Sequence, residues 1–205
     1  LDNVTYLSSR TVSHRDYGLV KICSTDGIEG IGFCYVGNRA GEILPVIIEH
    51  LLAPLLIGRD SLEVEGLWKE MYQEALLQGR AGTVMRAISI LDTALWDLNA
   101  RTAGLPLHKY LGAVNADKVP AYASGGYYVD GKTPDDLAAE MAHYVSLGFK
   151  AVKLKTGRGT PAQEEDRLRA VRERVGYDIE VMLDANNAWS DVTCLLYTSP
   201  SPRDA

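Results

Sequence analysis

The chain has 205 residues, of which 46% are hydrophobic and 23% are charged, and this balance is typical of a globular protein rather than a disordered or fibrous one. Its formal net charge of -6 and its lack of basic runs argue against a nucleic-acid-binding surface, so small molecules are the expected partners. Three scattered cysteines without CxxC spacing argue against a disulfide framework, and we therefore expect a cytoplasmic location.

A membrane-spanning helix is not expected either. The most apolar segment, residues 43–57, is interrupted by two prolines, a glutamate and a histidine, whereas a spanning helix needs about 20 consecutive apolar residues. No signal-peptide pattern is visible, and we predict no membrane partner. The chain opens without a methionine, so we expect an incomplete N-terminus.

Two apolar segments near the N-terminus predict an antiparallel hairpin. Residues 18–24 (GLVKICS) and 28–36 (IEGIGFCYV) are expected to be strands, joined by a turn at Thr25-Asp26-Gly27. The turn and second strand also contain a G-x-x-G-x-G pattern, which suggests a phosphate-binding loop. A strand follows these glycines where such a loop needs a helix, so we favour the plain hairpin.

Residues 41–103 show apolar positions at helical spacing, and glycines divide them into three predicted helices. Asp92 and Asp97 lie in the last of these helices. Five positions correspond to about 500° around a helix axis, so the two carboxylates do not share a face. We expect one of them to cap the helix or pair with Arg86 or Arg101, rather than both to bind a metal.

After residue 117, short apolar runs alternate with long helices. Strands are predicted at residues 119–124, 150–155 and 180–184, and helices from Thr133 to about Leu147 and from Pro161 to Val175. A repeat of about 30 residues is that of a right-handed βαβ crossover. We therefore predict three parallel strands that begin an α/β sheet or barrel.

Polar side chains lie at the predicted carboxyl ends of these three strands. They are Ser124 on the first strand, Lys153 and Lys155 on the second, and Asp184 and Asn186 on the third. Carboxyl ends of parallel strands share one edge, so all five are expected to converge there. Each also has a structural interpretation: solvated lysines on an edge strand, an aspartate that caps the next turn, and a serine that satisfies loop backbone. Their convergence favours function.

The lysine pair suggests a reaction. Lys153 and Lys155 are two positions apart on a strand and therefore share a face. Two ammonium groups roughly 6 to 7 Å apart repel by about 2.5 kcal/mol at an effective dielectric near 20, which lowers one lysine pKa and makes a base available near neutral pH. Asp184 offers a ligand for a divalent cation. These parts suit removal of a proton next to a carboxylate, with Mg²⁺ stabilising the enediolate.

At these residues the sequence resembles the enolase superfamily, in its mandelate racemase and muconate lactonizing branch. The similar segments are residues 26–32 (DGIEGIG), 87–97 (AISILDTALWD), 104–107 (GLPL), 152–155 (VKLK) and 183–186 (LDAN). The resemblance covers the chain up to about residue 193. It implies a fold of mixed class, α/β plus α+β: an enolase-like capping domain of antiparallel strands and helices at residues 1–117, followed by three βα units of a (β/α) barrel at residues 118–193.

The resemblance also implies a role for each candidate residue. Lys155 would be the general base, Lys153 would assist it and tune its pKa, and Asp184 would be the first Mg²⁺ ligand. Asn186 and Ser124 would contact the substrate carboxylate. A complete barrel takes about 250 residues, so we expect an incomplete barrel in which two further carboxylate ligands and a second base belong to later strands.

We therefore predict a Mg²⁺-dependent enzyme that abstracts a proton alpha to a carboxylate through an enediolate, as an acid-sugar dehydratase. A racemase, epimerase or cycloisomerase of the same family is the alternative. A catalytically inert fragment with open strand edges and a lysine Schiff-base lyase are further interpretations. A homo-oligomer is expected for the full-length parent.

The last residues, 194–205 (CLLYTSPSPRDA), depart from the pattern. A helix should follow the third strand, yet this segment contains two prolines that would break it. The segment resembles translated adaptor or vector read-through, so we expect a non-native tail; a genuine disordered tail is the alternative.

Overall fold

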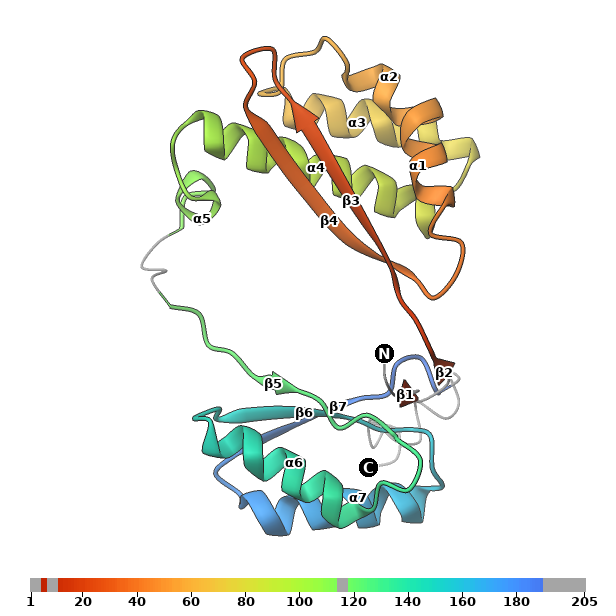
Figure 1. The fold of residues 1–205 in the computed structure, drawn as a ribbon, viewed down its shortest axis with the longest axis vertical. Coiled ribbons are helices and arrows are strands. Elements are labelled where there is room, and N and C mark those ends of the chain that lie inside the picture. Colours follow the sequence, from red (N-terminus) through yellow and green to blue (C-terminus); the bar gives the residue numbers. More distant parts are fainter. Residues whose placement is uncertain (1–4, 7–10, 114–117, 190–205) are drawn as a thin grey trace, which may run out of the picture. The chain divides into compact units, whose positions relative to one another are not determined.

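The structure is a computed structural model that describes residues 5–6, 11–113 and 118–189 (Figure 1). The chain divides into two compact units, one spanning His14–Lys118 and the other combining the described parts of residues 1–13 and 119–205. The predicted domain boundary after residue 117 adjoins residues outside the described ranges and stays a prediction. The predicted non-native tail at residues 194–205 also lies outside the described residues.

The unit that spans His14–Lys118 begins with an antiparallel hairpin of β3 (Asp16–Cys23) and β4 (Glu29–Gly37). Its turn is closed by a 3.0 Å hydrogen bond from the Gly27 N–H to the Ser24 carbonyl. Gly27 has a φ of 83°, a left-handed conformation that favours glycine. The predicted hairpin is confirmed.

The glycines of the G-x-x-G-x-G pattern allow close packing of a helix rather than phosphate binding. A Cβ atom on Gly30 would collide with the Ala94 carbonyl, and one on Gly32 would collide with the Ile90 carbonyl. Both carbonyls belong to α4 (Thr83–Thr102), which packs against the hairpin. A side chain at either glycine would force strand and helix apart.

The other secondary-structure elements described in this unit are helices. They are α1 (Ile43–Ile47), the π-helix η1 (Ile48–Leu52), α2 (Ala53–Leu56), α3 (Val64–Glu74), the 3₁₀-helix η2 (Ala75–Leu77), α4 and α5 (Leu107–Tyr110). Buried residues of α4 recur every three or four positions, at Val84, Ile88, Leu91, Leu95 and Leu98, and form the core with residues of the other helices. Within the described residues, no helix is long and apolar enough to cross a membrane.

The two aspartates of α4 do not form a metal pair. Asp97 accepts a 2.9 Å hydrogen bond from the Ile31 N–H and pairs with Arg101 at 2.8 Å, as the sequence predicted for one of the two carboxylates. Asp92 is half-buried, and burial, together with the nearby Glu65 carboxylate, raises its pKa. Asp97 therefore ties α4 to β4, which is a structural role.

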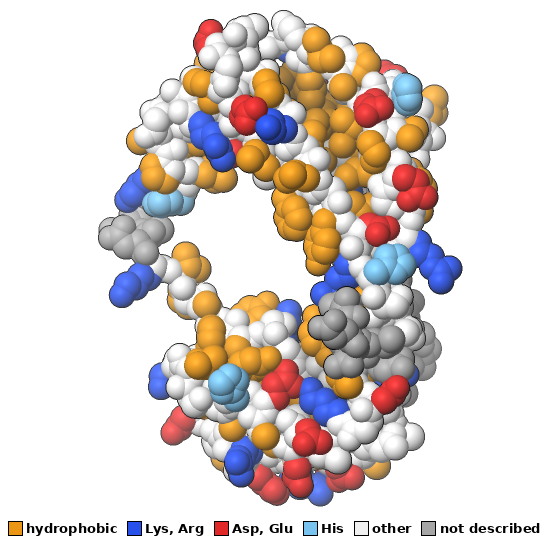
Figure 2. Space-filling view, viewed as in Figure 1, with side chains coloured by type: hydrophobic (Ala, Val, Ile, Leu, Met, Phe, Trp, Pro, Cys, Tyr) orange, Lys and Arg blue, Asp and Glu red, His pale blue; other side chains and the backbone are white. Residues whose placement is uncertain are grey.

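The hairpin face that does not pack against α4 is apolar and exposed (Figure 2). Tyr17, Leu19, Phe33 and Tyr35 on this face are between 40% and 74% exposed. Tyr17 is opposite Tyr35 in the strand register, and its ring stacks on Phe33 with 5.3 Å between centroids. These cross-strand contacts stabilise the hairpin.

The other unit contains a parallel sheet in the order β5 (Ala123–Ser124), β6 (Ala151–Lys155) and β7 (Glu180–Asp184). Two short strands, β1 (Thr5–Tyr6) and β2 (Thr11–Val12), pair separately. The three predicted parallel strands are thus present. The first is shorter than predicted, because only its last two residues have ladder partners on β6.

Helices α6 (Pro134–Ser146) and α7 (Pro161–Val175) cover one face of the parallel sheet (Figure 1). Each begins with a capping box, led by Thr133 and Thr160 respectively, which satisfies the first backbone N–H groups. The core between sheet and helices contains Leu137, Met141, Val152, Leu154 and Val171. Because Val152 and Leu154 face the helices, the period-two alternation of β6 directs its two lysines to the opposite face.

Candidate active site

Strands β6 and β7 bring Lys155 and Asp184 together. The two residues are partners in the parallel register, and Lys155 Nζ lies 2.8 Å from Asp184 Oδ2. Lys153 Nζ lies 3.6 Å from the same oxygen. Lys155 is only 5% exposed, so its ammonium group needs an anionic neighbour to offset the loss of water. The predicted convergence of these three residues is present, while their catalytic roles stay predictions.

Electrostatics favour the charged forms of both Asp184 and Lys153. Burial by itself raises the pKa of the Asp184 carboxyl, but hydrogen bonds from Lys155 and from the Asn186 N–H outweigh it, so the pKa lies below its usual value. A hydrogen bond to the Tyr122 hydroxyl, with a smaller contribution from Asp184, raises the pKa of Lys153 against the effect of burial. The lowering of a lysine pKa that we expected from mutual repulsion is therefore not seen at Lys153.

Two tyrosines that were not predicted from the sequence each contact one lysine. The Tyr122 hydroxyl accepts a 3.2 Å hydrogen bond from Lys153 Nζ, and its ring centroid lies 5.0 Å from that nitrogen. The Tyr127 ring centroid lies 5.3 Å from Lys155 Nζ, within the range of a cation–π contact. Tyr122 precedes Ser124 by two positions, so strand alternation could have revealed it. Tyr127 lies in a loop, where no periodic signal exists.

Ser124 and Asn186 lie beside the three charged residues. Ser124 is the register partner of Lys153 and is exposed. The backbone N–H of Asn186 donates a 3.0 Å hydrogen bond to Asp184 Oδ1, and its φ of 45° is one that asparagine tolerates. Asp184 therefore caps the turn after β7 and contacts the lysines at the same time. Substrate contacts by Ser124 and Asn186 stay predictions.

A partly buried network anchors the loop that follows β5. Glu140 on α6 accepts hydrogen bonds from the Gly126 N–H at 3.0 Å, from the Tyr144 hydroxyl at 2.9 Å and from the Lys132 ammonium group. Burial raises the pKa of Glu140, but these hydrogen bonds, led by that from Lys132, outweigh it and lower the pKa. The network holds in place the loop to which Tyr127 belongs.

Asp184 fits one ligand position of a Mg²⁺ ion. Its carboxylate oxygens are hard donors of the kind that Mg²⁺ prefers, and the lowered pKa of the carboxyl keeps them charged at neutral pH. Within the described part of the chain, no group of three His, Cys, Asp or Glu residues is arranged to hold a metal. These residues thus supply one ligand rather than a complete coordination shell.

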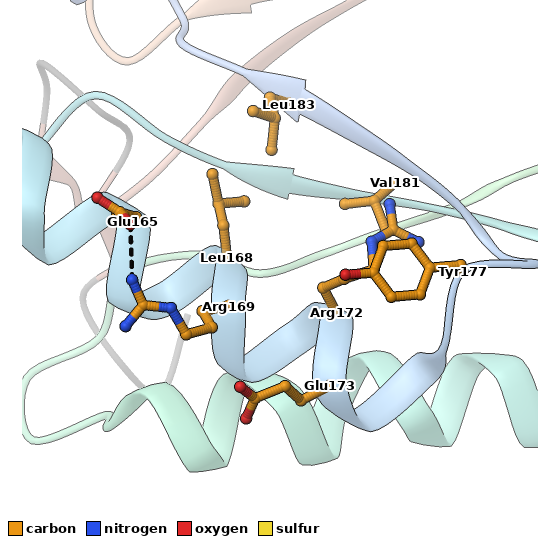
Figure 3. Close-up of a pocket in the computed structure, with 8 residues that line it drawn as sticks. All are labelled: Glu165, Leu168, Arg169, Arg172, Glu173, Tyr177, Val181 and Leu183. Atoms are coloured by element: carbon orange, nitrogen blue, oxygen red, sulfur yellow. Dashed lines mark hydrogen bonds and ion pairs between the residues drawn. The ribbon is translucent and has the colours of Figure 1, made fainter.

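A hollow of about 390 Å³ lies away from these residues, between α7 and β7 (Figure 3). Leu168, Val181 and Leu183 form its apolar part. Three charged residues that line it have structural partners: Arg169 pairs with Glu165 at 2.6 Å, and Arg172 donates to backbone carbonyls. None of the five candidate residues lines it, so the strand ends remain the candidate site.

Comparison with known families agrees with the fold described above. Residues 2–112 match the model of the mandelate racemase / muconate lactonizing enzyme N-terminal domain, and residues 136–197 match the enolase C-terminal domain-like model.

Among curated proteins, the chain is 39% identical over 170 residues to arabinonate dehydratase of Saccharolobus solfataricus, covering 83% of this chain and 45% of that protein. It is 35% identical over 172 residues to 3,6-anhydro-alpha-L-galactonate cycloisomerase of Streptomyces coelicolor, covering 83% of this chain and 46% of that protein. The chain thus spans about half the length of the curated relatives it matches.

Solved structures show the same relationship. A crystal structure of L-talarate dehydratase from Polaromonas sp. JS666, complexed with Mg and L-glucarate, has a TM-score of 0.76 and 32% identity over 92% of this chain and 51% of that chain. The family model covers more than half of the chain, and the fold is that of an enolase-like capping domain followed by parallel βα units. The chain belongs to the mandelate racemase/muconate lactonizing enzyme family of the enolase superfamily.

Proposed function

We propose that the protein is a Mg²⁺-dependent dehydratase that removes the α-proton of a small acid-sugar carboxylate. The observation that supports this most is the meeting of Lys153 and Lys155 at the Asp184 carboxylate, at the carboxyl ends of β6 and β7. The dehydratases among its relatives act on or bind sugar acids, and the Polaromonas enzyme was crystallised with Mg.

In this proposal Asp184 would supply one carboxylate ligand to the Mg²⁺ ion, and we assign no further ligand among the described residues. The bound ion would supply Lewis-acid polarisation of the substrate carboxylate, which acidifies the adjacent C–H bond. Ser124 and Asn186 would contact that carboxylate from the neighbouring strand ends.

Lys155 is the proposed base. In its neutral form its Nζ atom accepts the α-proton, and its burial next to the Tyr127 ring keeps bulk water away from that nitrogen. Lys153 keeps a positive charge 3.6 Å from the Asp184 carboxylate. In this proposal that charge stabilises the negative charge that develops on the substrate.

A cycloisomerase is the second candidate, because the Streptomyces relative is one. Dehydration, racemisation and cycloisomerisation can share removal of the α-proton. The group that expels the leaving group or returns a proton on the other face decides the outcome, and we assign no described residue to that role.

A substrate panel tests the proposal. The protein would be incubated with Mg²⁺ and, separately, with arabinonate, glucarate and 3,6-anhydrogalactonate, and products would be followed by NMR and mass spectrometry. A dehydratase forms a 3-deoxy-2-keto acid with the loss of one water, whereas racemisation and cycloisomerisation conserve mass. We expect dehydration that EDTA abolishes. Turnover that is insensitive to EDTA, or products of unchanged mass only, would overturn the dehydratase proposal.

The proposed ligand is thus a small carboxylate rather than a nucleic acid or a membrane. A homo-oligomer and a cytoplasmic location stay predictions. Size-exclusion chromatography with light scattering would test the first, and fractionation of cells that produce the protein would test the second.

A further inference from the structure

A buried ion pair lies behind the end of β6. Glu164 and Arg167, three positions apart on α7, are each 8% exposed, and Arg167 Nε lies 3.3 Å from Glu164 Oε2. Removing two charged groups from water is costly, and apolar residues of similar size often replace such pairs without loss of stability. The same helix also has an exposed ion pair between Glu165 and Arg169. Charged residues on α7 can therefore pair without being buried.

Glu164 connects two loops to α7. Its Oε1 atom accepts a 2.7 Å hydrogen bond from the Gly159 N–H, in the loop after β6, and a 2.6 Å hydrogen bond from the Tyr128 hydroxyl, in the loop after β5. Thr156 also donates to the carboxylate at 3.4 Å. Burial and the hydrogen bond to Glu164 raise the pKa of Tyr128, so its hydroxyl remains a donor.

Arg167 reaches the strand end itself. Its Nη2 atom donates a 3.2 Å hydrogen bond to the backbone carbonyl of Lys155, and its guanidinium carbon lies 4.1 Å from the centroid of the Tyr128 ring. A planar guanidinium can make both contacts at once, whereas an ammonium group cannot. The peptide plane of Lys155 is therefore held from the helix side of β6, while its Nζ contacts Asp184 on the other side.

From this geometry we propose that Glu164, Arg167 and Tyr128 form a clamp that positions the Lys155 side chain. The clamp fixes the Lys155 carbonyl and the loop that follows β6, and so sets the direction in which the Lys155 side chain leaves the strand. It touches neither the Lys155 ammonium group nor Asp184 in any contact described above, so these are positioning residues. The functional importance of the clamp rests on the proposed role of Lys155 as a base, but its structural effect can be measured without substrate.

Acetylation of Lys155 by acetic anhydride at fixed pH measures how well its amine is held. Peptide mass spectrometry gives the acetylation rate of Lys155 relative to that of the exposed Lys69. Lys69 is the internal reference, because it reacts with the same reagent in the same sample. In the double variant Glu164→Leu/Arg167→Met, in which neither charge is left unpaired, we expect the relative rate to rise about tenfold, because the Lys155–Asp184 hydrogen bond loses its fixed geometry. The matched control Glu165→Leu/Arg169→Met alters the exposed pair of the same helix and should leave the rate unchanged.

Arg167→Lys separates positioning from charge balance. This variant keeps a positive charge next to Glu164 but loses the planar group that spans the Lys155 carbonyl and the Tyr128 ring. We expect the same rise in acetylation as in the double variant, with a thermal midpoint near that of the wild type. A wild-type acetylation rate in Arg167→Lys would overturn the proposal, and so would a wild-type rate in the double variant. If the double variant does not fold, Arg167→Lys decides alone.

This experiment separates the clamp from the enzyme activity. Increased acetylation with no turnover of any acid sugar would support the clamp and contradict the proposed function. Unchanged acetylation in the variants, in a protein that dehydrates sugar acids, would contradict the clamp and support the proposed function.

Discussion

Lys155 and Asp184 are opposite one another on adjacent parallel strands, and the 2.8 Å contact between Lys155 Nζ and Asp184 Oδ2 joins their side chains at the strand ends. Lys153 lies 3.6 Å from the same oxygen. One carboxylate thus contacts both ammonium groups and offsets part of their mutual repulsion on this face of the sheet. Removing the Asp184 carboxylate would leave the buried Lys155 side chain without this partner.

We therefore expect Asp184→Asn to lower the free energy of unfolding by roughly 2 to 3 kcal/mol, since hydrogen bonds to charged groups are strong and their loss exposes the cost of burial. Urea denaturation at pH 7 would measure this. Asp166→Asn is the matched control, because the Asp166 side chain is 64% exposed and its ion pair with Arg169 is on the surface. Equal losses of unfolding free energy in the two variants would show that the Lys155–Asp184 contact stabilises the protein no more than an exposed ion pair does.

Glu140 predicts a pH dependence of stability. Its pKa is lower in the folded protein than its usual value of about 4.3, so its stabilising effect is complete above that pH and is lost as the pH falls through the lower, folded-state pKa. The difference in unfolding free energy between wild type and Glu140→Gln should therefore be largest near pH 7 and shrink toward pH 3. Glu173→Gln, at an exposed position on α7, should show no such trend. A constant difference across this range would contradict the assignment.

Gly32 tests why the glycine pattern of β4 exists. Gly32→Ala should cost about 1 to 3 kcal/mol, because its Cβ would meet the Ile90 carbonyl of α4 and separate strand from helix. Gly66 on α3 is the control, since a Cβ there meets nothing within 4 Å and alanine favours helix. Gly66→Ala should stabilise the protein by about 0.5 to 1 kcal/mol. Thermal or urea denaturation gives both values, and a neutral Gly32→Ala would reject the packing explanation.

Tyr122→Phe removes the hydroxyl that accepts a hydrogen bond from Lys153 but keeps the ring. The pKa of Lys153, which this hydrogen bond raises, should fall toward its ordinary value. The stabilisation that accompanies the raised pKa is complete below about pH 10.4 and is lost above it, so wild type and variant should differ in stability at neutral pH and converge in strong alkali. NMR titration of the Lys153 side chain would measure the shift. If the titration midpoint of Lys153 were unchanged in Tyr122→Phe, Asp184 alone would set the pKa of Lys153.

Much of the unit that contains the parallel sheet was predictable, because its local sequence signals agreed with each other. Helix α7 has the predicted bounds, with a capping box at Thr160 and a glycine at its end, and β7 has the predicted five residues. The convergence of Lys153, Lys155 and Asp184 followed from strand alternation and parallel pairing alone. The first strand was predicted too long, because an apolar run does not show which of its residues find a ladder partner.

The residues around the lysines were not predictable in the same way. Helix α7 contains so many charged residues that its sequence suggests a fully solvated surface, yet Glu164 and Arg167 are buried. Their burial depends on Tyr128, 36 positions before Glu164 in the chain. Contacts between a loop and a strand, such as that of Tyr127 with Lys155, arise from tertiary packing and leave no periodic pattern in the sequence.

Exchange of the substrate α-proton with solvent deuterium tests the proposed role of Lys155 most directly. With Mg²⁺ and an acid sugar that the protein turns over, NMR should show deuterium incorporation at the α-carbon by the wild type and by Lys150→Ala, which alters an exposed lysine just before β6. Lys155→Ala should reduce the exchange rate by at least about 100-fold, as expected for loss of a general base. Exchange at the wild-type rate in Lys155→Ala would contradict the account.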